Sequence, residues 1–332
     1  YQYNIFTVDE CLFTGDTLFI GGCGKFFEGN ATCSQDGFIH IFDFQNQMKD
    51  QNKIVVGNQK VHQGPIWKID WAHPHFGNIL ASCSYDKNVA VHKEQQLNNQ
   101  QKIWETIWKK ELEGSINYIQ FSPYECGFNI ACGSSVGKVY LLVLRTQDSN
   151  MQEYSWQAHE LGVNCICWEP FKADDDFTID QVEKSNNKFT KLITGSCDKT
   201  LKIWSLEIQN GQLSHNLIYE IIGVHNDWIR DVAWSPLSQY EYDIIASCSE
   251  DQIVVVWKLN YDQNNNNYQQ IEHQIINIQF NGPVWRLNWN FQGNQLSISS
   301  ATQNNNNQVV IVQQNEDDEW VQVEEQNNIN QN

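Results

Sequence analysis

The sequence predicts an all-β fold, a six-bladed β-propeller. Four of its six repeat units carry a strand-like run that ends near a Cys or Ser, then a turn Asp, and a large ring six residues after that Asp. Aligned on the Cys-like position, the copies fall at 33, 83, 133, 197, 248 and 299, so successive copies lie 50, 50, 64, 51 and 51 residues apart. A period near 50 with four short strands per unit is typical of WD-repeat propellers, whose sheets bury their faces on one another.

The second unit shows the expected strands in order. Residues 64–71 alternate and run into a turn at 72–74, and further strands are predicted at 79–83, 89–92 and 103–108. The same order recurs in the later units, and each first strand closes on an aromatic residue: Trp71, Phe121, Trp168, Trp234 and Trp289.

A buried polar network is expected within the repeats. In WD repeats, a His before the first strand bonds the turn Asp, a strand Ser or Thr, and the ring of the third strand. Three first strands here are preceded by such a His. The residues assigned to this structural network are His62, Asp86, His92, His159, Asp198, Trp204, His225, Asp251, Trp257 and, in the first unit, Asp36.

Composition excludes several functions. The chain has 21 basic and 40 acidic residues, a net charge of −19, which argues against a nucleic-acid surface and an electrostatic membrane anchor. Its 10 cysteines form no Cys-x-x-Cys pair and several share one repeat phase, so we expect buried packing residues in a reducing compartment. No run of 18 apolar residues is present, and the first twenty residues do not resemble a signal peptide.

Two polar clusters resemble metal ligands, and both are interpreted as surface loops. His73 and His75 flank a proline where a strand runs into a turn, and Asp174–Asp176 lie in an insertion of about 14 residues between 171 and 188. Neither has the spacing of a metal site, so we expect no metal and no cofactor. The third unit has Val136 and Leu142 in place of its Asp and ring, and the sixth has Thr302 and a polar insert.

Longer strings resemble one family. The segments 71–86 (Trp-Ala-His-Pro-His-Phe-Gly-Asn-Ile-Leu-Ala-Ser-Cys-Ser-Tyr-Asp) and 225–236 (His-Asn-Asp-Trp-Ile-Arg-Asp-Val-Ala-Trp-Ser-Pro) closely resemble the Sec-thirteen family, as do shorter strings at 129–135, 158–164 and 284–289. The resemblance runs from about residue 31 to 323. The sister Seh-one family of the nuclear pore shares the Trp-Ala-His-Pro string and ranks second.

This resemblance implies a cytoplasmic scaffold without catalysis. Members form an open six-bladed ring that a larger partner completes by donating strands. The implied partners are the Sec-thirty-one-type subunit of the COPII coat at ER exit sites and on vesicles, an α-helical Y-complex nucleoporin at the nuclear pore, and nutrient-signalling complex proteins. A third reading is a closed WD-repeat ring that binds peptides on its top face.

Residues 1–30 depart from this family. The segment 13–30 resembles part of glyoxalase II, a hydroxyacylglutathione hydrolase, and by that match Asp16 is a metal-bridging carboxylate while Lys25 and Phe27 lie near a glutathione site. The enzyme's His-rich motif, Thr-His-x-His-x-Asp-His, is nowhere in this sequence, and one carboxylate cannot hold two metals. We interpret residues 1–30 as a fusion remnant or a wrongly joined gene model, residues 31–323 as the propeller and 324–332 as a polar tail.

The ring is expected to close between the first and sixth units. The sixth lacks its turn Asp and ring, and the first lacks a recognisable first strand. Unpaired strand edges are a liability that an added partner strand can cover. The residues predicted at these edges are Phe38, Ile39, Ile41, Val309, Ile311, Val321 and Val323.

Overall fold

A computed structural model describes most of the chain. The described residues are 5–8, 11–14, 29–33, 36–43, 53–55, 60–96, 102–144, 151–171, 189–236, 242–262, 267–301, 308–315 and 318–323. Asp16, Lys25, Phe27, Asp174–Asp176 and Thr302 lie outside them, as do residues 324–332. Among the described residues, no helix is long and apolar enough to cross a membrane.

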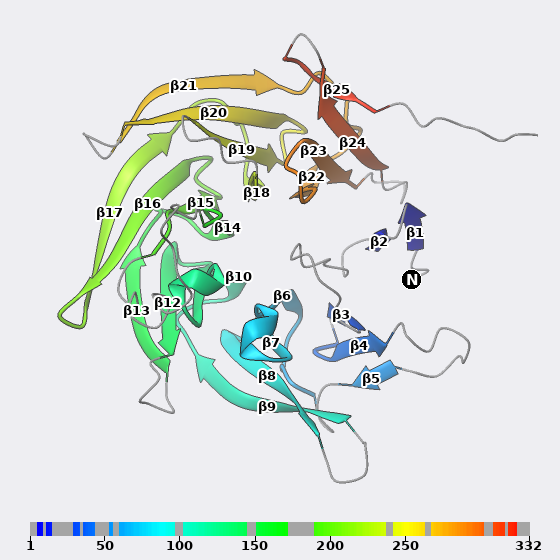
Figure 1. The fold of residues 1–332 in the computed structure, drawn as a ribbon, viewed down its shortest axis with the longest axis vertical. Coiled ribbons are helices and arrows are strands. Elements are labelled where there is room, and N and C mark those ends of the chain that lie inside the picture. The colour runs from blue at the N-terminus through cyan, green and yellow to red at the C-terminus, as the bar shows by residue number, and fades with distance from the viewer. Residues whose placement is uncertain are drawn as a thin grey trace, which may run out of the picture.

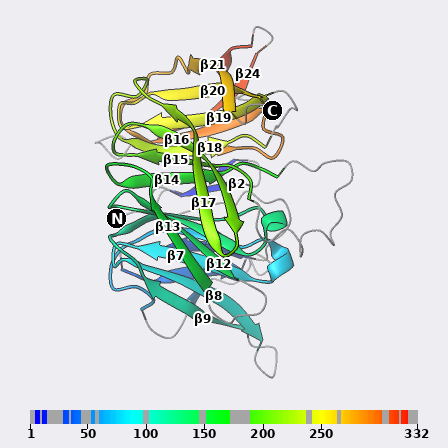
Figure 2. The same cartoon turned by 90° about the vertical axis from the view of Figure 1, so that its left-hand side faces the viewer.

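Five antiparallel four-stranded sheets are arranged around an axis as blades (Figure 1). In the side view of Figure 2, blade β6–β9 lies at the bottom and blade β18–β21 at the top, with the sheets between them lying one above another. Within each blade the strands run from the axis outward in sequence order. The blades comprise β6 (Ile66–Trp71), β7 (Ile79–Ser84), β8 (Asn88–Gln96) and β9 (Lys102–Glu111); β10 (Ile116–Phe121), β11 (Asn129–Ser134), β12 (Lys138–Leu144) and β13 (Met151–Gln157); β14 (Val163–Trp168), β15 (Leu192–Ser196), β16 (Leu201–Gln209) and β17 (Gln212–Ile221); β18 (Ile229–Trp234), β19 (Tyr242–Ser249), β20 (Val254–Asp262) and β21 (Asn267–Ile275); and β22 (Val284–Trp289), β23 (Gln295–Ser300), β24 (Gln308–Gln314) and β25 (Trp320–Gln322).

The expectation of six blades is wrong, because the described residues form five four-stranded blades. The first unit forms only a three-stranded sheet, in the order β3 (Gly29–Cys33), β4 (Ile39–Asp43) and β5 (Lys53–Val55). Its strands correspond to the second, third and fourth strands of a blade, since Cys33 pairs with Ile39 as Cys83 pairs with Val89. The innermost strand is therefore missing among the described residues.

The sequence before β3 explains this difference. The five inner strands share the pattern Ile/Val-x-x-apolar-x-Trp/Phe. Four of them begin 15 to 19 residues before the position equivalent to Cys33, and no six-residue window that begins at residues 14–18 repeats the pattern. The described residues nearer the start instead form a separate hairpin, β1 (Ile5–Val8) with β2 (Cys11–Thr14), which pairs with no other strand described. In Figure 1 this hairpin lies between β22–β25 and β3–β5.

The strand register also corrects the repeat alignment in the fourth unit. Gly195, not Cys197, is the equivalent of Cys83, because Gly195 pairs with Leu201 as Cys83 pairs with Val89. A small residue is required there, since a Cβ on Gly195 would lie 2.6 Å from the Cys165 sulfur. Ile229 Cγ2 of the next blade would lie 2.7 Å from the same Cβ, so this position of the repeat marks a close approach of the next blade.

The turn Asp has a local role in building the three blades that contain it. In the turn between β7 and β8, Lys87 has φ +68°, and the backbone N–H of Asn88 donates to the Asp86 carboxylate over 2.9 Å. Lys199 and Gln252 have the same φ after Asp198 and Asp251. A side-chain acceptor that bonds the backbone two residues on stabilises such a tight turn.

Two short 3₁₀ helices, η1 (Pro74–Phe76) and η2 (Tyr124–Cys126), connect the first and second strands of their blades. His73 and His75 belong to the η1 turn, where His75 N–H donates to His73 Nδ1 and the His73 ring stacks on Tyr124. In the part of the chain that the structure describes, no cluster of three or more His, Cys, Asp or Glu side chains is arranged to hold a metal ion.

The hydrophobic core lies between the blades. One group of buried residues joins Cys33, Ile39 and Ile41 to blade β6–β9, and others join each later blade to its neighbour. Central strands such as β7 and β11 are buried at every position, which shows that both faces of their sheets are covered. Packing between blades, and not within one sheet, therefore holds the fold together.

Candidate functional site

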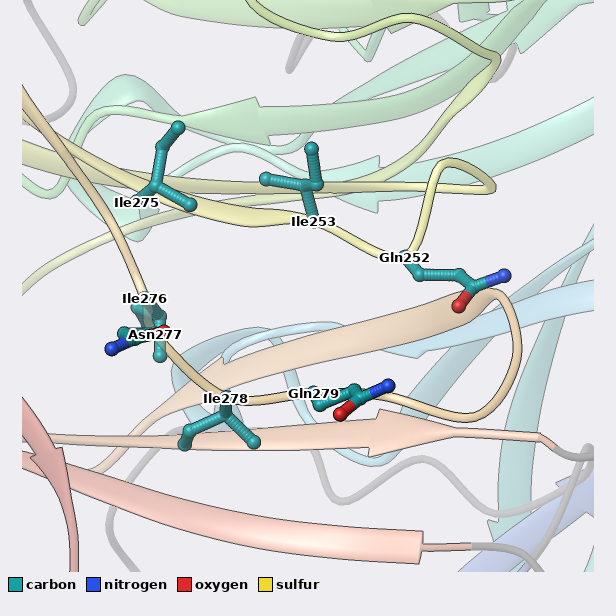
Figure 3. Close-up of a pocket in the computed structure, with 7 residues that line it drawn as sticks. All are labelled: Gln252, Ile253, Ile275, Ile276, Asn277, Ile278 and Gln279. Carbon is teal, nitrogen blue, oxygen red and sulfur yellow. The ribbon is translucent and has the colours of Figure 1, made fainter.

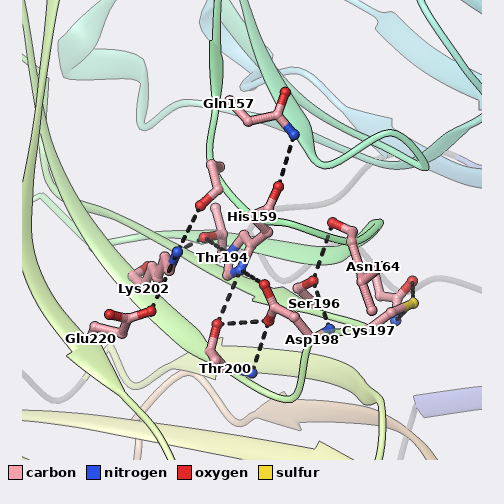
Figure 4. A network of polar contacts seen from close by, with 12 residues as sticks. Gln157, His159, Asn164, Thr194, Ser196, Cys197, Asp198, Thr200, Lys202 and Glu220 are labelled. Atoms are coloured by element: carbon pink, nitrogen blue, oxygen red, sulfur yellow. Dashed lines mark hydrogen bonds and ion pairs between the residues drawn. The ribbon is translucent and has the colours of Figure 1, made fainter.

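The polar network is most complete in blade β14–β17 (Figure 4). His159 is buried between two partners: its Nδ1 lies 2.9 Å from the Asp198 carboxylate, and its Nε2 lies 2.7 Å from the Thr194 hydroxyl. The indole N–H of Trp204 donates to the same hydroxyl over 3.0 Å. Burial alone would raise the pKa of Asp198, but hydrogen bonds from His159 and Thr200 outweigh it and hold that pKa far below its usual value.

Blade β18–β21 repeats this arrangement. His225 Nδ1 lies 3.2 Å from Asp251 and its Nε2 lies 2.8 Å from the Ser247 hydroxyl, to which the Trp257 indole donates over 2.9 Å. In both blades one hydroxyl joins a ring of the third strand to a His that precedes the first strand. The network therefore ties the inner, second and third strands of a blade together.

Blade β6–β9 uses a second histidine where the other two have tryptophan. His62 lies 3.1 Å from Asp86 and 2.8 Å from the Ser82 hydroxyl, which is 2.9 Å from His92 Nε2. Asp86 can only accept, so His62 Nδ1 carries the proton, Ser82 donates to His62, and His92 Nε2–H donates to Ser82. His92 Nδ1 is then left to accept from the Thr106 hydroxyl, 3.0 Å away. A neutral His92 thus replaces the indole donor.

The remaining copies have no such network among the described residues. Asp36 is exposed and accepts a local bond from Phe38 N–H, and the Phe42 side chain lies outside the described part. Val136 and Leu142 occupy the corresponding places in blade β10–β13, where the Glu113 backbone N–H donates to the Tyr140 hydroxyl over 3.2 Å.

Sequence reasoning missed the contacts around the axis. In all five blades the inner strand shifts register beside its second residue, forming a bulge. Bulges redirect side chains, and these reach toward the next blade. Trp67 donates to Ser115, Asn117 to the Val163 carbonyl and Asn164 to the Ile229 carbonyl. A register shift leaves no signal in the hydrophobic pattern of a single sequence.

A second series of contacts joins the fifth residue of the inner strands β6, β10 and β14 to the next inner strand. Asp70 accepts the backbone N–H of Phe121 over 2.7 Å, and Gln120 accepts that of Trp168 over 3.1 Å. The Cys167 sulfur accepts the N–H of Trp234 over 3.2 Å. The acceptor changes chemically, but its place and its target, the closing aromatic residue, stay the same.

A largely buried cluster around Lys191 joins two blades, and sequence reasoning missed it too. Lys191 Nζ lies 3.1 Å from Glu169 and 3.6 Å from Asp243, and 3.7 Å from the centre of the Tyr261 ring. The Tyr268 hydroxyl donates to Asp243 over 2.8 Å, and burial together with Asp243 raises the pKa of Tyr268. Its residues come from distant parts of the chain, so no local motif indicates it.

Blade β22–β25 leaves one face uncovered. Along β23 the residues alternate between half-buried and buried, whereas β7 and β11 are buried throughout. Val309, Val321 and Val323 of the predicted edge are exposed at 38%, 41% and 39%, and Ile311 is half-buried. We call the face that carries Asn288, Ile311 and these valines the open face. Of the other predicted edge residues, Ile39 and Ile41 are buried against blade β6–β9, and Phe38 is half-buried.

Strand order refines which elements are edges. β4 lies between β3 and β5, and β24 lies between β23 and β25, so neither is an edge strand. The edges are β25 on the outside of its blade and β3 on the axial side of its sheet, where no described strand pairs with it.

The described surface offers little for catalysis. A groove of about 440 Å³ is lined by Gln252, Ile253 and residues 275–279, none of which is a titratable or nucleophilic side chain (Figure 3). Seven of the eight cysteines whose side chains the structure describes are buried, and burial raises the pKa of the Cys33 thiol to about 12 and that of Cys126 to about 11. These thiols stay protonated and are unsuited to nucleophilic work.

The fold and the His-to-Asp networks define a WD-repeat β-propeller. The family model for the WD domain, G-beta repeat, matches residues 54–93, 150–205 and 217–258. The chain is 35% identical over 281 residues to a Drosophila melanogaster protein named Protein SEC13 homolog, covering 82% of this chain and 72% of that protein. It is 35% identical to Protein transport protein sec13 of Emericella nidulans, over 82% of this chain and 84% of that protein. It is 31% identical to Protein transport protein SEC13 of Cryptococcus neoformans, over 81% of this chain and 83% of that protein.

This chain belongs to the SEC13 family, the Sec-thirteen family that its sequence resembles. The resemblance of residues 1–30 to glyoxalase II remains a sequence interpretation, because the catalytic positions assigned to it lie outside the described residues.

The network in blade β14–β17 predicts a ranking of two substitutions. Trp204→Ala removes a buried ring and a hydrogen bond and should lower the free energy of unfolding by about 3–5 kcal/mol. Asp198→Ala strands the His159 donor and should cost about 1–3 kcal/mol. Urea unfolding of both variants measures the difference, and equal stability of the two variants and wild type would refute the assigned roles.

His92 predicts an acid-sensitive blade. Burial lowers its pKa from 6.5 to about 3, so the native state binds fewer protons than the unfolded state between these values. The stability that neutral His92 provides is therefore complete above pH 6.5 and is lost as the pH falls toward 3. Between pH 6.5 and 4 the free energy of unfolding should fall more steeply in wild type than in His92→Trp, by up to about 1.4 kcal/mol per pH unit. Parallel pH profiles for the two proteins would contradict this role.

Proposed function

We propose that this protein is a non-enzymatic scaffold that binds larger partners by accepting strands from them. The observation that carries the proposal is the open face of blade β22–β25. Exposed valines on one side of a sheet, opposite a face packed into the core, are typical of a surface that another sheet covers. The name Protein transport protein, borne by relatives 31–35% identical to this chain, supports a role in transport.

The partner of this scaffold is proposed to be a Sec-thirty-one-type subunit of the COPII coat, acting in ER-to-Golgi transport at ER exit sites and on vesicles. An α-helical Y-complex nucleoporin at the nuclear pore is proposed as the second partner. Both assignments rest on family membership. The open face supports strand addition as the mode of binding, since main-chain bonds supply affinity and alternate side chains supply specificity.

Charged substitutions on the open face test this proposal. Val309→Asp and Val321→Asp leave the free fold intact because both side chains are already exposed, but they place a carboxylate inside the contact. Each should weaken co-purification with the strand-donating segment of a Sec-thirty-one-type subunit by about tenfold or more.

The matched control is Leu217→Asp, at an exposed position of the outer strand β17, which should bind like wild type. If both valine variants retained full binding while remaining folded by circular dichroism, partner docking on the open face would be excluded.

A further inference from the structure

Two turns at one end of blade β22–β25 form the walls of a small pocket. Residues 290–294 connect β22 to β23 and residues 315–319 connect β24 to β25, so both turns lie at the same end of the sheet. The pocket has a volume of about 250 Å³ and is smaller than typical small-molecule pockets, which begin at about 300 Å³. It is lined by Ile244 of the preceding blade, by Gly293 and Asn294 of the first turn, and by residues 313–315 and Trp320 at the second. Its size suits a single side chain of a larger partner.

Both turns are fixed by an asparagine at their first position. The side-chain oxygen of Asn290 accepts the backbone N–H groups of Asn294 and Gln295, over 3.1 and 3.2 Å. The side-chain oxygen of Asn315 accepts the backbone N–H of Glu319 over 2.8 Å. Walls that are already in place before a ligand arrives lower the entropic cost of binding it.

The first turn presents the most exposed large apolar side chain among the described residues. Phe291 is 85% exposed, and it lies two residues before Gly293 of the pocket. A single exposed apolar side chain is common on protein surfaces. Phe291 differs because it stands on a fixed turn beside a pocket whose apolar lining residues, Ile244 and Trp320, are each only 7% exposed. An exposed ring next to an apolar pocket is typical of a binding anchor.

The charge of this part of the chain indicates the chemistry of the partner. Residues 287–332 contain six Asp or Glu and no Lys, Arg or His. Two of these acids, Asp318 and Glu319, belong to the second turn and are exposed. In the preceding blade Lys258 is paired with a pocket residue, and its Nζ lies 4.4 Å from the centre of the Tyr242 ring. The net charge of −19 repels a second copy of this chain and attracts a basic segment.

We propose that this pocket, with Phe291 beside it, is a second docking site that binds a basic segment of a partner protein carrying one bulky apolar side chain. That side chain enters the pocket against Ile244 and Trp320 and packs on Phe291. The Lys or Arg residues that flank it pair with Asp318 and Glu319. The site goes beyond the proposed function, since none of the exposed valines of the open face lines the pocket.

Fluorescence anisotropy with the full chain and three labelled peptides tests this site. The test peptide is Gly-Lys-Lys-Phe-Lys-Lys-Gly, and the other two replace its Phe by Ala or its four Lys by Glu. Only the test peptide should bind, and its affinity should fall as salt is added, because salt screens the attraction between exposed charges. A version with benzoylphenylalanine in place of Phe should cross-link, on irradiation, to residues 290–295 or 313–320.

Substitutions in the protein separate the two parts of the site. Phe291→Ala should weaken binding of the test peptide about tenfold, and Glu319→Lys about fivefold. The matched controls are Leu161→Ala and Glu160→Lys, at exposed positions in the loop before β14, and both should bind as wild type. All four side chains are exposed, so circular dichroism should show the wild-type fold in each variant.

Equal losses in Glu319→Lys and Glu160→Lys would show a general attraction to an acidic protein and would overturn the site. It would also be overturned if the test peptide failed to bind, or if its cross-links lay elsewhere in the chain. Unchanged affinity in Phe291→Ala would remove that ring from the site. Each of these outcomes leaves the open-face test of the proposed function unaffected, so the two can fail separately.

Discussion

Each blade of this protein depends on the next one. A four-stranded sheet of this size has two apolar faces and cannot cover both of them itself, so its inner strand must be held by its neighbours. In β6, β10 and β14, side chains at two fixed places do this: the bulge residue and the fifth residue of the strand. A carboxylate, an amide and a thiol serve equally at the second place, as Asp70, Gln120 and Cys167 show.

The same dependence explains where the molecule is incomplete. Among the described residues, blade β22–β25 has no following inner strand, and the face that such a strand would adjoin carries exposed valines. The internal networks of His159 and His225 lie inside blades that are covered on both sides. The residues that stabilise the blades and the residues proposed to bind a partner therefore lie in different parts of the ring. Substitutions can test stability and binding separately.

The repeat pattern predicted much of this structure and failed where spacing carries no information. Turn Asp and ring positions identified the strands, because a tight turn and a buried ring constrain residue type. The blade count was wrong because the first unit keeps its Cys33-to-Ile39 pairing but has no inner strand within the part of the chain that the structure describes. The cluster around Lys191 and the bulges at Trp67 and Arg230 arise only when distant segments meet, so single-sequence patterns could not show them.

Hydrogen exchange on the free protein and on its complex with a strand-donating partner segment tests the central claim most directly. The account predicts that amides of residues 309–312 and 320–323 and of β3 gain protection on binding, while those of blade β18–β21 change little. Protection that instead appeared across the loops at one end of every blade, with no change in these strands, would contradict it.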